Sequence, residues 1–162
     1  MLEKMNVDAS QTLEKFLHLK DEILGFLIDK LEALNKLEQE IFERSLALKN
    51  PEAPHQLQPG EKELWTEYKL RYKEITTPIS LKPPEGDGSF GKPTKYEYLS
   101  YPDTKILFIM RSPDRAVVET QYEYGLKKKE QFVLKKKGDS WKIDTKKYGF
   151  QNEDKWMKDY GW

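Results

Sequence analysis

The sequence predicts an α+β fold in which a long N-terminal helix and a second helix pack on a curved antiparallel sheet. Apolar residues recur every three or four positions in residues 10–48 and again in residues 64–75, as on one face of a helix. Polar and apolar residues alternate in several segments after residue 94, which is typical of half-buried strands. Segments rich in proline and glycine, residues 51–60 and 83–93, separate these regions. Helices followed by consecutive strands favour an α+β arrangement.

The composition indicates one domain with a very polar surface. The chain has 162 residues, 37% of them hydrophobic and 35% charged, and contains no cysteine. A reducing compartment fits this composition, since secreted domains of this size often use disulfides. We find no basic leader followed by an apolar run and no long uncharged stretch, so we expect a cytoplasmic protein without a membrane segment.

The charges balance over the whole chain but not locally. There are 28 basic and 28 acidic residues, yet residues 1–50 carry seven of the former and ten of the latter, while residues 115–148 carry ten and five. Such asymmetry can steer a charged partner.

The first helix is expected from Ser10 to a stop at Asn50-Pro51, with Asp8 or Ser10 as its N-cap. A leucine face of this kind also fits a coiled coil, but the charged positions do not keep a heptad pattern, so we favour packing on a sheet. Its apolar face contains Leu13, Phe16, Leu17, Ile23, Leu24, Leu27, Ile28, Leu31 and Leu34.

The second helix is expected to be shorter and to end near Thr76-Thr77-Pro78. Its helical face is aromatic, and we interpret these residues as core: Leu64, Trp65, Tyr68, Tyr72 and Ile75.

The second half of the chain predicts a run of strands joined by short turns. Tyr96–Ser100 and Ile106–Met110 are the first two, and the apolar second one is expected to be covered on both faces. Arg115–Tyr124 has the clearest alternation, and Gln131–Lys137 pairs with Trp141–Asp144 through a tight turn. The tail, with Phe150, Trp156 and Tyr160, is expected to form a short helix or a flap against the sheet. We divide the single domain into a helical part, a loop, a sheet and a tail: residues 1–82, 83–94, 95–148 and 149–162.

No pattern in the sequence predicts a catalytic residue, a metal site or a cofactor. The only histidines are His18 and His55, neither beside a candidate nucleophile or a second ligand. Phosphate-binding glycine motifs are missing from the sequence. The lysine runs at 127–129 and 135–137 resemble a phosphate-binding surface, but nearby glutamates dilute the positive charge. We therefore do not expect an enzyme or a nucleic-acid-binding protein.

Residues 91–162 resemble a family of bacterial immunity proteins of polymorphic toxin systems, which have a nuclear transport factor 2-like, or cystatin-like, fold. The resemblance is carried by the order of five segments: Gly91-Lys92-Pro93 with Tyr96-Glu97-Tyr98; Arg115–Gln121; Phe132–Lys136; Trp141–Asp144; and Asp154-Lys155-Trp156. It implies a cone-shaped domain in which a bent sheet wraps helices. It also implies an inhibitor that binds and neutralises a cognate protein toxin by occlusion, without catalysis.

The same fold also hosts enzymes and carriers with a pocket inside the cone, so a small-molecule function remains the alternative. Its pocket would be lined by tyrosines 72, 96, 122 and 124. For the toxin-binding reading, the resemblance transfers no contact residue, so we select exposed charges and aromatic anchors as candidates: Arg115, Glu119, Gln121, Glu123, Trp156 and Tyr160. An open sheet face is also compatible with a homodimer.

Overall fold

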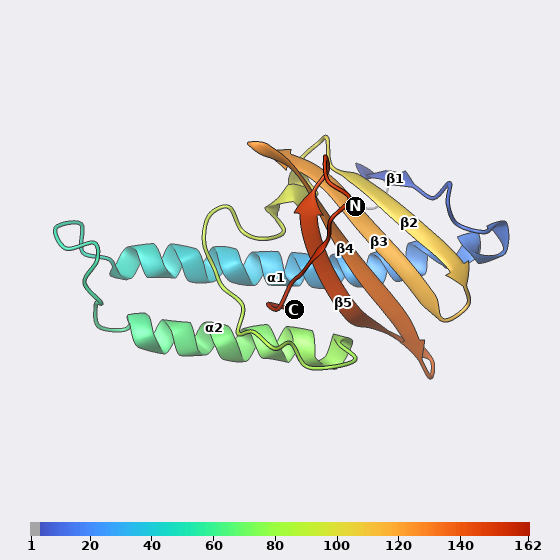
Figure 1. The fold of residues 1–162 in the computed structure, drawn as a ribbon. Coiled ribbons are helices and arrows are strands. Elements are labelled where there is room, and N and C mark those ends of the chain that lie inside the picture. Colours follow the sequence, from blue (N-terminus) through green and yellow to red (C-terminus); the bar gives the residue numbers. More distant parts are fainter. Residues whose placement is uncertain (1–3) are drawn as a thin grey trace.

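The computed structural model describes residues 4–162 and has an α+β fold, as the sequence predicts. Two helices pack on one face of a six-stranded sheet, which stays open (Figure 1). The strands lie in chain order, and all neighbouring pairs are antiparallel except the first, which is parallel. The sheet is therefore mixed, not purely antiparallel as expected. The strands are β1 (Asn6–Asp8), β2 (Lys105–Ser112), β3 (Arg115–Tyr124), β4 (Leu126–Lys137), β5 (Ser140–Phe150) and β6 (Met157–Lys158).

The long helix α1 (Lys20–Leu48) begins later than predicted and follows a 3-10 turn, η2 (Glu14–Leu19). The preceding segment is held on the edge of the sheet, because Thr12 Oγ1 donates to the Phe108 carbonyl at 2.7 Å and Leu13 N donates to the Met110 carbonyl at 3.0 Å. Leu13 and Leu17 are consequently 45% and 41% exposed, not buried as predicted. The rest of the predicted face is buried against the sheet, as are Leu37 and Ile41.

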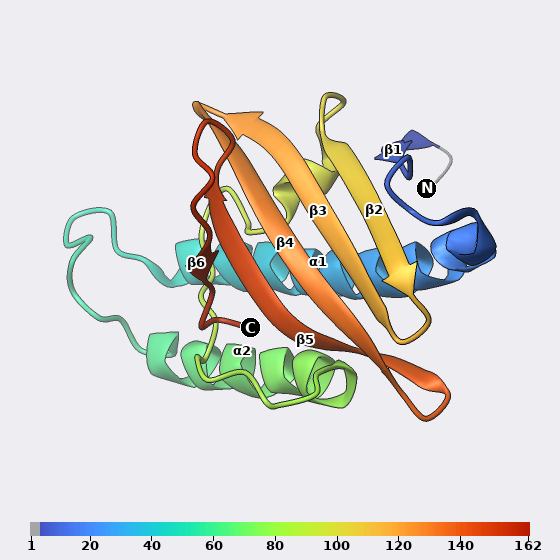
Figure 2. The ribbon, with the colours of Figure 1, turned by 45° about the vertical axis from the view of Figure 1, so that its right-hand side comes forward.

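The second helix, α2 (Glu61–Thr76), runs back alongside α1 (Figures 1 and 2). It buries Leu64, Tyr68 and Tyr72 as predicted, whereas Trp65 and Ile75 of the predicted face are half-buried against the core. A short 3-10 turn, η3 (Thr77–Ile79), ends it at the proline. Two arginines and two glutamates on the exposed side tie the helices together: Arg44 and Arg71 both bind Glu40 and Glu67. Exposed pairs of this kind contribute little each, so the buried face determines the packing.

The sheet has one apolar face toward the helices and one polar face away from them. On β3, Ala116, Val118 and Thr120 are each at most 2% exposed, while Arg115 and Glu123 on the other face are exposed. The same alternation makes β2 half-buried, so the prediction that it is covered on both faces was wrong. Figure 2 shows α1 crossing behind the twisted sheet, with α2 beside it below β5.

The segment predicted as the first strand is a 3-10 turn, η4 (Glu97–Ser100). Both tyrosines of the segment are buried, Tyr96 at 3% and Tyr98 at 2% exposed. The turn is fixed by the Thr104 hydroxyl, which donates to the Tyr98 carbonyl at 2.6 Å. Tyr96 and Tyr98 are two residues apart, and this spacing suggested a strand with both rings on one face. A 3-10 turn also directs both rings into the core, so the spacing does not distinguish the two structures.

The tail lies against the sheet, as predicted, but contains the short strand β6 in place of a helix. Trp162 is buried, and its ring packs edge to face on the Phe132 ring, with 6.1 Å between the two ring centres. Among residues 4–162 no helix is both long and apolar enough to cross a membrane.

Candidate functional site

The face of the sheet that points away from the helices is formed by the four long strands β2 to β5. Strand alternation directs nine basic and three acidic residues to it. The basic ones are Lys105, Arg111, Arg115, Lys127, Lys129, Lys135, Lys137, Lys142 and Lys147; the acidic ones are Glu119, Glu123 and Asp144. We call this surface the outer face.

Four of the predicted partner-binding residues share the outer face, because they alternate along β3. Arg115 and Glu123 are exposed, and Glu119 and Gln121 are half-buried. Glu119 accepts a hydrogen bond from Gln131 of β4 at 3.0 Å, which fixes its carboxylate on the sheet.

Trp156 also reaches the outer face, at one end of it. The Lys129 ammonium lies 4.2 Å from the centre of the Trp156 ring and donates to the Glu153 carbonyl at 2.6 Å. The tail crosses so closely here that a Cβ on Gly149 would lie 2.7 Å from the Lys155 carbonyl oxygen. The tail thus covers Lys129 and Gly149, and Trp156 is half-buried.

Tyr160 does not join this set. It is 59% exposed, but its carbonyl accepts the Gly86 amide at 2.7 Å and the Lys158 ammonium lies over its ring. This contact holds it against the loop of residues 83–93, beyond β5. The structure therefore brings five of the six predicted residues to one face.

A buried group of charges inside the fold was missed at the sequence level. Lys146 of β5 is 3% exposed and lies 2.8 Å from Asp159 and 3.7 Å from Glu130 of β4. Its ammonium also donates to the Tyr96 hydroxyl at 3.1 Å, and the Tyr98 hydroxyl donates to Glu130 at 2.7 Å. We call these five residues the interior ion cluster.

The electrostatics of this cluster keep Lys146 charged. Burial opposes its charge, but Glu130, Tyr96 and Asp159 together raise the pKa of Lys146 well above its usual range. Burial likewise raises the pKa of the Glu130 carboxyl, and Lys146 partly offsets this effect. A strongly held ammonium is a poor nucleophile or base, so the cluster has no amine ready for covalent chemistry.

Glu38 of α1 faces the same interior and is 2% exposed. Burial raises the pKa of its carboxyl to about 7, although the positive charges of Lys95 and Lys146 favour the ionised form. Burial also lowers the pKa of the Lys95 ammonium. The interior therefore contains ionisable side chains, Glu38, Lys95 and Lys146, in addition to the hydrophobic core.

A pocket of about 210 Å³ opens at the end of the interior ion cluster. Its lining includes two of the four predicted tyrosines, Tyr122 and Tyr124, together with Tyr98, Tyr101 and Glu130. The other two, Tyr72 and Tyr96, are buried in the core and do not line it. The volume is below the roughly 300–1,000 Å³ typical of ligand pockets.

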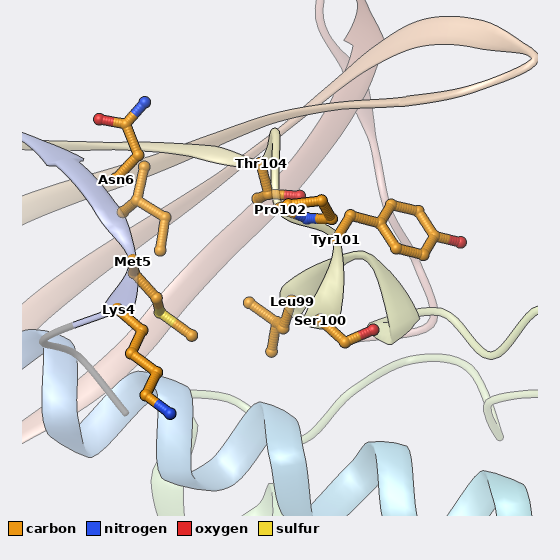
Figure 3. Close-up of a pocket in the computed structure, with 9 residues that line it drawn as sticks. Lys4, Met5, Asn6, Leu99, Ser100, Tyr101, Pro102 and Thr104 are labelled. Atoms are coloured by element: carbon orange, nitrogen blue, oxygen red, sulfur yellow. The ribbon is translucent and has the colours of Figure 1, made fainter.

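A second pocket of about 210 Å³ lies at the other side of η4, between it and β1 (Figure 3). Met5 and Leu99 point into this space, whereas the ring of Tyr101 points away from it. Its polar groups do not include a carboxylate or an imidazole, so it offers little for acid–base or metal chemistry. Within residues 4–162 we find no group of histidines and carboxylates that could hold a metal ion.

Comparisons with protein-family models, with curated proteins and with solved structures found no match to this chain.

Proposed function

We propose that this protein is an immunity protein, which binds a cognate bacterial toxin and neutralises it by occlusion. The observation that carries the proposal is the outer face. It is a sheet surface on which Arg115, Glu119, Gln121 and Glu123 stand together, and the helices lie on the opposite face (Figure 2). The segment resemblance supplies the class of partner.

The construction of the outer face supports this proposal. Its strands are paired over ten register positions between β3 and β4, so its side chains stand on a scaffold that changes little on binding. A stable inhibitor interface buries about 1,600 Å² in total. The outer face offers four neighbouring strands of eight to twelve residues for one side of such an interface. Blocking an active site requires a rigid surface of this kind and no bond-making group.

The test is a protection assay with the toxin encoded beside this protein. Cells that express the toxin should survive when this chain is co-expressed, and the two proteins should co-purify. Arg115→Asp combined with Gln121→Arg should abolish protection, whereas Tyr160→Ala, which lies away from the outer face, should not. If the wild-type chain neither binds nor protects against any neighbouring toxin, the proposal is wrong.

One observation favours a second candidate function, a small-molecule carrier. The pocket beside the interior ion cluster combines aromatic walls with a buried carboxylate, Glu130. A screen of small aromatic compounds by ligand-observed NMR tests this function, with Tyr122→Ala as the control that removes a wall. The carrier function is rejected if no compound loses binding in that variant.

A further inference from the structure

The outer face has a charge pattern that the stability of the sheet does not explain. Arg115 of β3, Lys135 of β4 and Lys142 of β5 are register partners, so three cations lie in one row across three strands. Like charges directly opposite each other destabilise a sheet, whereas opposite charges would stabilise it. We call these residues the cationic row.

Neighbouring groups neutralise the cationic row only in part. Lys135 lies 3.0 Å from Asp144. Lys142 donates to the Pro78 carbonyl of η3, so its ammonium is turned toward the end of α2, and of this row only Arg115 and Lys135 present their charges on the outer face. No carboxylate among residues 4–162 lies within ion-pair distance of Arg115. The tail lies at the far end of the outer face, so it leaves this row uncovered.

An apolar row lies directly beside the cationic row. Ile109, Val117 and Val133 are register partners on β2, β3 and β4, and they face outward. Ile109 is half-buried, and Val117 and Val133 are 6% and 7% exposed in the free chain, so a partner reaches the two valines once the long, flexible side chains beside them on the sheet move aside. Protein interfaces commonly combine an apolar centre with a polar rim.

We propose that the outer face receives an acidic protein surface with an apolar centre, whose carboxylates meet Arg115 and Lys135 and whose apolar side chains meet Ile109, Val117 and Val133. This inference deepens the proposed function, on which it rests for the identity of the occupant. Charge complementarity selects an acidic partner. The apolar row and the intervening Glu119 disfavour a phosphate backbone. Among the described residues of the outer face, the half-buried Trp156 is also the one aromatic ring on which a base could stack.

The test needs no toxin, so its outcome is separate from that of the protection assay. The probes are a short peptide of glutamates and leucines, a matched peptide with serines in place of the leucines, and a DNA duplex. Each is titrated into the full chain labelled with ¹⁵N, at about 50 mM and about 300 mM salt. We expect the leucine peptide to bind most tightly, to shift amide signals along the two rows, and to weaken as salt rises.

Charge reversal then locates the site. Arg115→Glu with Lys135→Glu should weaken binding of the leucine peptide at least about tenfold. Lys36→Glu with Lys62→Glu changes the net charge equally at exposed positions on the helices and should leave binding within about twofold. Amide spectra of both variants check that they fold, and Arg115→Gln is the milder substitute if the double variant does not.

Three outcomes overturn the inference. The first is that signals shift elsewhere or not at all, and the second is that both pairs of charge reversals weaken binding equally. The third is that the DNA duplex binds more tightly than the leucine peptide, which would assign the face to nucleic acid. If the peptide binds but the protection assay fails, the inference that the outer face binds an acidic protein surface stands, and the proposal that the partner is a toxin is rejected.

Discussion

The sharpest test of the buried charges is the substitution Glu38→Gln, which removes a titrating group from the interior while keeping its shape. The pKa of Glu38 is about 7 in the folded chain, compared with 4.5 for an ordinary glutamate. Because the folded pKa is raised, this residue contributes its full stability below pH 4.5 and loses it as the pH rises through about 7. The difference corresponds to about 3 kcal/mol in the free energy of unfolding.

Denaturant unfolding of both proteins between about pH 4 and pH 8 measures this effect. The two should be of similar stability at the acidic end, and Glu38→Gln should become the more stable by about 3 kcal/mol at the alkaline end. Glu43→Gln, at an exposed position on the same helix, is the control and should show no such divergence. A constant difference between wild type and Glu38→Gln across the pH range would refute the reasoning.

Three further substitutions test the packing. Lys146→Met should cost about 3–5 kcal/mol of unfolding free energy, because it leaves the buried Glu130 and the half-buried Asp159 without their cation. A neutral effect in denaturant unfolding would contradict this prediction. Trp162→Ala should cost about 3–5 kcal/mol by removing a buried ring from Phe132, and an unchanged melting temperature would mean that the tail is not docked in solution. Gly88→Ala should destabilise by more than about 1 kcal/mol, because Gly88 has a φ of 73° and the added Cβ would lie 2.7 Å from the Tyr68 hydroxyl oxygen; Gly91→Ala, where nothing lies within 4 Å, is its control.

The sequence predicted the parts of the fold that depend on repeated patterns. The leucine spacing placed α1, the aromatic spacing placed α2, and the alternation along Arg115–Tyr124 correctly identified both faces of β3. The predicted start of α1 was wrong, because hydrogen bonds from Thr12 and Leu13 to backbone carbonyls of β2 hold this segment on the sheet edge and override the local helical pattern.

The interior ion cluster was not predictable in the same way. Lys146 stands in a run of polar residues that reads as exposed, and a register shift between β4 and β5 helps to set which residues of β5 face inward. Its partners Glu130 and Asp159 come from a neighbouring strand and from the tail, so only the tertiary structure brings the three together. The sequence held one signal of this cluster. Glu130 is two residues before Phe132 and four before Leu134, so the alternation along β4 directs it to the same buried face as these two apolar residues.

The shortness of the two outermost strands has a consequence for aggregation. β1 has three residues and β6 has two, and they flank β2 and β5, which have eight and eleven. A long edge strand presents many unpaired backbone N–H and C=O groups that can pair with another chain. Because β1 and β6 are short, each presents only a few such groups. Removal of β1 or β6 would bare three positions of β2 or two positions of β5 and lengthen the edge that is open to other chains, which favours self-association even where the core stays intact.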